Sequence, residues 1–131
     1  MNIAALIPAR KGSKRIPKKN HHSIDGEYLI NKVINNLEKS KYITDIFVTT
    51  DDDELKEKIT DSRVKFLSRN PKFSDDYSSV IDLVRNHYFE DLADFDAIFQ
   101  TYVHAVSINS QTIDHAIKKL MDSKYNSIMS I

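Results

Sequence analysis

The chain has 131 residues, of which 40% are hydrophobic and 29% are charged, and its 19 basic side chains balance its 19 acidic ones. This length and composition predict one globular domain, residues 1–131, with a core of its own, and they do not suit a disordered or membrane-spanning chain. There is no cysteine, which excludes a disulfide framework and a thiolate nucleophile, and without a signal-peptide pattern we expect a cytoplasmic protein that binds no membrane.

A short apolar strand, residues 2–7, opens the chain and runs into a loop, Ile7–Asn20, that reads I-P-A-R-K-G-S-K-R-I-P-K-K-N. The loop carries six lysine or arginine side chains and no acid, and the prolines near its two ends restrict its backbone. Gly12, one of two glycines in the chain, lets the backbone approach a ligand closely. Because open α/β sheets bind ligands where strands end, this loop is predicted to bind a polyphosphate. A solvated basic turn and a nucleic-acid or targeting patch are the alternatives.

Charge is distributed unevenly between this loop and the rest of the chain. Outside the loop, 13 basic side chains stand against 19 acidic ones. A nucleic-acid-binding protein needs a basic face that extends along the polyanion, and the remaining sequence offers none. We therefore expect a small anionic ligand and no nucleic-acid partner.

The run from Ile7 to Asn20 resembles the N-terminal signature of the CMP-sugar synthetases, the acylneuraminate cytidylyltransferases, which include the CMP-pseudaminic acid enzymes. The resemblance implies that the loop wraps the triphosphate of CTP. It implies Arg10 and Lys19 as the catalytic contacts to the triphosphate, with Lys14 and Arg15 assisting. The further nucleotide-binding residues implied in this loop are Ala9, Gly12, Ser13 and, for the base and ribose, Asn20.

Two adjacent histidines, His21 and His22, follow the loop. Histidine is a common metal ligand, but neighbouring side chains point in different directions and no third ligand is close in the sequence. We expect a surface loop here rather than a metal site. The Asp25-Gly26 pair that follows predicts a turn.

A helix is predicted over residues 29–41 from its apolar face, and a buried strand over 45–50 follows it. The strand ends in four consecutive acids. Asp51 and Glu54 predict a capping-box start for a helix that runs to Ile59, with Mg²⁺ binding as the alternative. The resemblance implies that Asp51 lies near the nucleotide, because the family has a similar Thr-Thr/Ser-Asp sequence at this strand end.

A third strand is predicted over residues 64–67, and a long loop leads from it to a helix over 78–88. The loop resembles an Arg-Pro segment of the family, with one residue inserted between the arginine and the proline. The resemblance implies that Arg69 and either Ser78 or Ser79 help to hold the cytidine. An ordinary helix N-cap is the alternative role for Ser78.

A fourth strand is predicted over residues 97–102, and Ser110 is predicted to cap a helix that runs to Met121. Tyr102, at the end of this strand, resembles the pseudaminic-type members of the family, although a proline and a threonine of their motif are missing. The resemblance implies that either Tyr102 or Gln100 faces the base.

Strands alternate with helices along the chain, which predicts right-handed crossovers and a parallel sheet covered on both faces. The predicted class is therefore α/β. The resemblance implies a three-layer αβα fold with a mostly parallel, Rossmann-like sheet of the nucleotide-diphospho-sugar transferase type. It spans all 131 residues but only about the first half of a family member, so we expect a truncated form of that fold, with a fifth strand starting over 126–131.

The activity that the resemblance implies is CTP-dependent nucleotidyl transfer. CMP from CTP is joined to an acidic nine-carbon sugar of the nonulosonic, sialic-acid-like class, and pyrophosphate is released. The resemblance also implies Mg²⁺ as cofactor, with its ligands mainly beyond Ile131, and a homodimer in the full-length form. A non-catalytic nucleotide-binding remnant and another sugar nucleotidyltransferase, such as a Kdo cytidylyltransferase, are the alternatives.

Overall fold

A four-stranded parallel sheet forms the centre of the molecule in a computed structural model that describes residues 1–11, 18–68, 72 and 80–129. The strand order is β5-β4-β1-β6, with every neighbouring pair parallel. The strands are β1 (Ile3–Pro8), β4 (Asp45–Thr50), β5 (Lys65–Ser68) and β6 (Ala97–Gln100). Because β4 and β6 flank β1 on opposite sides, the chain reverses its direction of travel across the sheet next to β1, and such a reversal is where open α/β sheets bind ligands.

Strand β1 is buried along its whole length because helices cover both faces of the sheet. Alternate side chains enter separate cores: Ile3, Ala5 and Ile7 face one, whereas Ala4 and Leu6 face the other. This alternation is the period-two geometry of a strand, with apolar residues on both faces as expected for a parallel sheet. The three-layer α/β prediction is confirmed.

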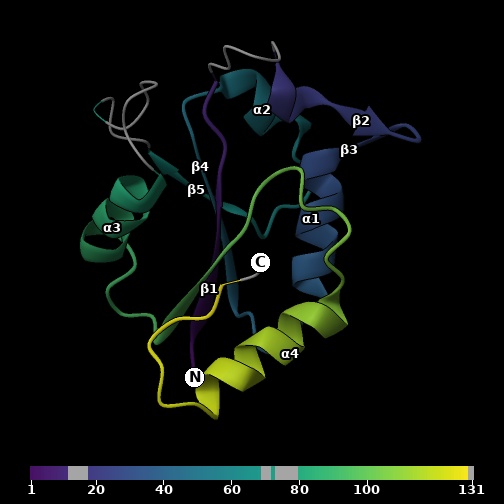
Figure 1. The fold of residues 1–131 in the computed structure, drawn as a ribbon. Coiled ribbons are helices and arrows are strands. Elements are labelled where there is room, and N and C mark those ends of the chain that lie inside the picture. The colour runs from purple at the N-terminus through teal and green to yellow at the C-terminus, as the bar shows by residue number, and fades with distance from the viewer. Residues whose placement is uncertain (12–17, 69–71, 73–79, 130–131) are drawn as a thin grey trace.

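Helices α1 (Leu29–Glu38) and α4 (Ser110–Met121) lie on one side of the sheet, and α3 (Val80–Glu90) lies on the other (Figure 1). Helix α1 buries four side chains at helical spacing, which are Ile30, Val33, Ile34 and Leu37. Among the described residues, no helix is long and apolar enough to cross a membrane.

Short elements connect the first strand to α1. The 3₁₀ helix η1 (Lys19–His21) is followed by a hairpin of β2 (Ser23–Ile24) and β3 (Glu27–Tyr28). The predicted turn at Asp25 and Gly26 joins these two strands, with φ angles of 53° and 81°. Positive φ at both central residues is the geometry of a type I′ hairpin turn, for which Asp-Gly is favoured.

Several predicted boundaries differ from the structure. Helix α1 ends at Glu38 instead of residue 41, and β6 ends at Gln100 instead of Tyr102. Residues 126–129 form no strand, so the described part of the predicted fifth strand is wrong. The first turn predicted at 78–79 lies outside the described residues.

Both predicted helix caps were misplaced by one residue. Helix α2 (Asp53–Lys58) is capped by Asp52, whose side chain accepts from the Leu55 N–H, and not by Asp51. Helix α4 is capped by Asn109, which accepts from the Thr112 N–H at 2.9 Å, and not by Ser110. Asp and Asn are strong N-caps, so the neighbouring residue with extended backbone takes the role.

Candidate functional site

The candidate site lies at the carboxyl ends of β1 and β4, beside α2 (Figure 1). Ala9 continues the line of β1: its N–H donates to the Thr49 carbonyl at 3.0 Å, and its own carbonyl accepts from the Thr50 hydroxyl at 2.5 Å. Ala9 is 2% exposed, so its side chain belongs to the core and only its backbone borders the site. These bonds determine where the cation-rich loop leaves the sheet.

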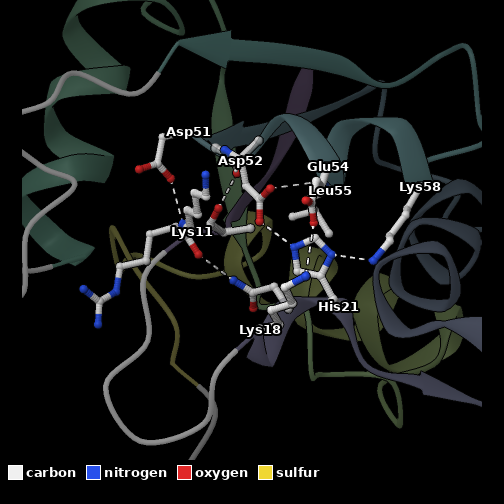
Figure 2. Close-up of polar contacts among 12 residues, drawn as sticks. Lys11, Lys18, His21, Asp51, Asp52, Glu54, Leu55 and Lys58 are labelled. Carbon is white, nitrogen blue, oxygen red and sulfur yellow. Dashed lines mark hydrogen bonds and ion pairs between the residues drawn. The ribbon is translucent and has the colours of Figure 1, made fainter.

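Asp51 is hydrogen-bonded to the backbone of Lys11, the residue that follows Arg10 in the loop. The Lys11 N–H donates to Asp51 Oδ1 at 2.7 Å, as Figure 2 shows. Asp51 is exposed, and this contact places its carboxylate against the backbone of the loop. Its predicted place near the nucleotide stays a prediction. In this structure Asp51 therefore holds the backbone of the loop and does not cap α2.

The far end of the loop returns to the near end through Asn20. Its side-chain Nδ2 donates to the Arg10 carbonyl at 3.0 Å, so the two described ends of the loop are tied together. Lys18 adopts a left-handed backbone with φ 52° and its ammonium lies 3.5 Å from Glu54. That ion pair is exposed on both sides, and solvent leaves such pairs little stabilising effect.

His21 connects the end of the loop to α2. Its Nε2 lies 2.5 Å from Asp52 Oδ2 and its Nδ1 lies 2.7 Å from Lys58 Nζ (Figure 2). The His21 side chain is 7% exposed and that of Asp52 is 4% exposed. The prediction of a surface loop is therefore wrong for His21, although its neighbour His22 is exposed. The contacts span 31 and 37 residues, and no sequence spacing signals them.

Asp52 keeps its negative charge in this buried place. Burial by itself raises the pKa of the Asp52 carboxyl, but hydrogen bonds from the His21 ring and from the Leu55 N–H outweigh it. The pKa of Asp52 is therefore lowered below its ordinary value. A carboxylate at this position complements both the start of α2 and the histidine ring.

Among the described residues, the one group of acids and histidines close enough together to hold a metal ion is His21, Asp52 and Glu54. This group does not fit a metal ion. The Nδ1 of His21 already accepts from the Lys58 ammonium and its Nε2 faces Asp52, so neither nitrogen has a free lone pair, and Lys58 repels a second cation. The prediction that Mg²⁺ ligands lie mainly beyond Ile131 is untested and stays a prediction.

The remaining predicted site residues fall into two sets. Arg10 is half-buried beside the sheet and Lys19 is exposed. Gln100 is the last residue of β6, where it pairs with Leu6 of β1, and Tyr102 follows that strand. Gln100 borders a groove of about 370 Å³ against α3, whereas the Tyr102 ring stacks on His104 at a centroid distance of 5.5 Å. The other predicted residues lie outside the described residues and are Gly12, Ser13, Lys14, Arg15, Arg69, Ser78 and Ser79.

Known proteins match this chain, some of them along nearly its whole length. The family described as Cytidylyltransferase matches residues 4–131. The N-acylneuraminate cytidylyltransferase A of Danio rerio is 29% identical over 130 residues, which are 99% of this chain and 30% of that protein. The 8-amino-3,8-dideoxy-manno-octulosonate cytidylyltransferase of Shewanella piezotolerans is 44% identical over 59 residues, which are 45% of this chain and 24% of that protein. The matched segment is thus less than a third of either relative.

Solved structures share the fold. CMP:2-keto-3-deoxy-manno-octonic acid synthetase complexed with CTP matches with a TM-score of 0.79 and 20% identity, over 94% of this chain and 48% of that one. A 4-diphosphocytidyl-2C-methyl-D-erythritol synthase matches with a TM-score of 0.68 and 16% identity, over 93% of this chain and 55% of that one. At these identities the likeness concerns the fold, and it confirms the predicted nucleotidyltransferase architecture. With the family match over residues 4–131 and the loop signature at the sheet's carboxyl edge, the chain belongs to the cytidylyltransferase family.

Proposed function

We propose that the chain carries the CTP-binding part of an enzyme that transfers CMP from CTP to an acidic sugar. The observation that supports this most strongly is the cation-rich loop at the end of β1, with both described ends held at the carboxyl edge of the sheet. Six cations on one loop suit the charge of a triphosphate, and charge-assisted hydrogen bonds are the strong ones.

The proposed reaction is an in-line displacement at the α-phosphate of CTP. The anomeric hydroxyl oxygen of the sugar forms the new bond to phosphorus, the bond to the β-phosphate oxygen breaks, and pyrophosphate leaves while the hydroxyl proton passes to solvent or a base. Such chemistry depends on positioning and on neutralising charge more than on a covalent intermediate. Arg10 and Lys19 are the proposed contacts to the triphosphate, and Lys14 and Arg15 are proposed to assist.

Two sugar classes are candidates for the acceptor. A nine-carbon nonulosonic acid is our first proposal, supported by the relative in Danio rerio, whose match covers 99% of this chain. An eight-carbon octulosonate is the second, supported by the higher local identity, 44%, to the relative in Shewanella piezotolerans. We propose Mg²⁺ as the cofactor, a homodimer as the full-length form and the cytoplasm as the location.

Binding of CTP, measured by isothermal titration calorimetry, tests the proposed triphosphate contacts. Arg10→Ala and Lys19→Ala should each weaken binding about tenfold or more, because each removes a charge-assisted contact worth about 1.5–3 kcal/mol. Lys124→Ala is the matched control, since it removes an exposed lysine that follows α4 and lies outside the cation-rich loop. Equal affinity in all three variants would contradict the assignment.

Turnover separates an active enzyme from a non-catalytic nucleotide-binding remnant. The assay detects pyrophosphate release from CTP with a nonulosonic acid or an octulosonate as acceptor. Release with one acceptor class identifies the sugar. CTP binding without pyrophosphate release in the presence of either acceptor supports the binding-module alternative. Asn20, Arg69 and either Ser78 or Ser79 are proposed to select cytosine, so CTP should bind more tightly than UTP.

A further inference from the structure

His21 sits at the centre of a hydrogen-bonded chain that joins the N-cap acid of α2 and the last lysine of that helix to the end of the cation-rich loop. Asp52 lies on one side of its ring and Lys58 on the other, at 2.5 Å and 2.7 Å. The ring is almost completely enclosed, with 7% of the side chain exposed. Lys58 also lies 4.9 Å above the ring centroid of Tyr28, which holds its ammonium in place from β3.

The partners of the ring determine which nitrogen carries its proton. A lysine ammonium has three donors and no acceptor, so Nδ1 of His21 must accept from Lys58. Nε2 must then carry the hydrogen and donate it to the Asp52 carboxylate. The histidine is therefore neutral, and a second proton on Nδ1 would face the Lys58 ammonium.

The chain of contacts continues from His21 into the proposed CTP site. His21 closes η1, which begins with Lys19 and contains Asn20. The Asn20 side chain bonds the Arg10 carbonyl, so the contacts of His21 influence both Arg10 and Lys19. We propose that His21 is a positioning residue that holds the end of the phosphate-binding loop on α2, in its neutral Nε2–H form. This inference rests on the proposed function.

Positioning and simple electrostatics make opposite predictions for Asp52→Asn. Within the described part of the chain, the charged groups that face His21 are Asp52, Glu54 and Lys58 of the α2 region, and Lys18 of the loop reaches Glu54. Replacing Asp52 by asparagine removes a negative charge beside a triphosphate site, which by charge alone strengthens binding. Asparagine still caps α2, but an amide N–H turned toward Nε2 breaks the contact to His21. The positioning role therefore predicts weaker binding.

The test measures CTP affinity by titration calorimetry, and thermal unfolding of each variant in parallel. His21→Leu and Asp52→Asn should weaken CTP binding about tenfold, because the loop's far end loses its attachment. His21→Gln, which keeps a donor toward Asp52 at the place of Nε2, should stay within about twofold of the parent chain. His22→Leu is the matched control, since it removes the exposed neighbouring histidine.

The ¹⁵N spectrum of the His21 ring gives a second readout that needs no nucleotide. The Nε2–H tautomer at neutral pH is the expected result, and an Nδ1–H or doubly protonated ring would overturn the proposal. Unchanged affinity in both His21→Leu and Asp52→Asn, or tighter binding in Asp52→Asn, would overturn it as well. A parent chain that binds no CTP contradicts the proposed function itself, and the positioning role falls with it.

Discussion

Two buried polar side chains, Thr49 and His87, are hydrogen-bonded to each other although they lie 38 residues apart in the chain. On the α3 side of the sheet, the Thr49 hydroxyl lies 2.7 Å from Nε2 of His87, and Nδ1 of His87 lies 2.7 Å from Asp91. Thr49 and His87 are 0% and 1% exposed, so the pair cannot meet a substrate and serves to attach α3 to β4. A buried polar group that loses its partner is costly, which makes such pairs sensitive to substitution.

Thr49→Val should lower the free energy of unfolding by about 1–3 kcal/mol, because it leaves a buried ring nitrogen of His87 without a partner while it keeps the side-chain volume. Urea denaturation followed by circular dichroism measures the change. Thr60→Val is the control, since Thr60 is exposed and its replacement should be nearly neutral. Equal stabilities of the two variants would show that the His87 contact contributes nothing.

Asp52 should make stability depend on pH in the acid range. Its pKa is lowered in the folded chain, so its contribution is present above the unfolded pKa of about 3.9 and is lost as the pH falls through the lower folded pKa. The difference in unfolding free energy between the parent chain and Asp52→Asn should therefore be largest near neutral pH and shrink below about pH 4. A difference that stays constant from pH 7 to pH 3 would contradict the lowered pKa.

At the level of elements, helix starts depend on which of several neighbouring polar residues has extended backbone. Four acids precede or begin α2, and Asn109 and Ser110 stand together at the start of α4. Each of these residue types can cap a helix, so composition narrows the cap to a short segment without selecting the residue. In the structure, the cap of each helix is the residue with extended backbone. This residue is Asp52 after β4 and Asn109 in the loop before α4.

Substitution of Asn109 by alanine should destabilise the protein by about 0.5–2 kcal/mol, because the Thr112 N–H loses its acceptor. Ser110→Ala, one residue away, should change stability by only a few tenths of a kcal/mol, because its hydroxyl caps no backbone group. Thermal unfolding of the two variants side by side gives the comparison. If the serine variant were the less stable one, the cap assignment would be reversed.

Strands β1, β4 and β6 could be predicted from sequence to within two residues, because each is a continuous apolar run between polar segments. The β2–β3 hairpin could not, since strands of two residues are too short to show alternation. The loop Ile7–Asn20 was identifiable from its cations and its glycine, whereas the attachment of His21 to α2 was not. A contact between residues that lie 31 positions apart produces no pattern in the local sequence.

For the whole molecule, the topology brings the basic loop to the side of the sheet where the carboxyl ends of the strands lie. The strand order places β1 between β4 and β6, so the loop after β1, the acids after β4 and the residues after β6 share that side. Apart from this loop the chain is acidic, which favours a small anion bound at one place over a long polyanion. Family membership and the fold agree with this arrangement.

Mapping CTP onto the chain by ¹H–¹⁵N NMR titration tests the central claim most directly. We expect amide shifts to change at residues 9–11, 18–21, 51 and 100–102, which are the described residues around the loop and the neighbouring strand ends. Residues 118–124 at the far end of α4 should not change, and inorganic triphosphate should reproduce the changes at the loop. Shift changes confined to α4, or none at saturating CTP, would contradict the claim that this loop binds the nucleotide.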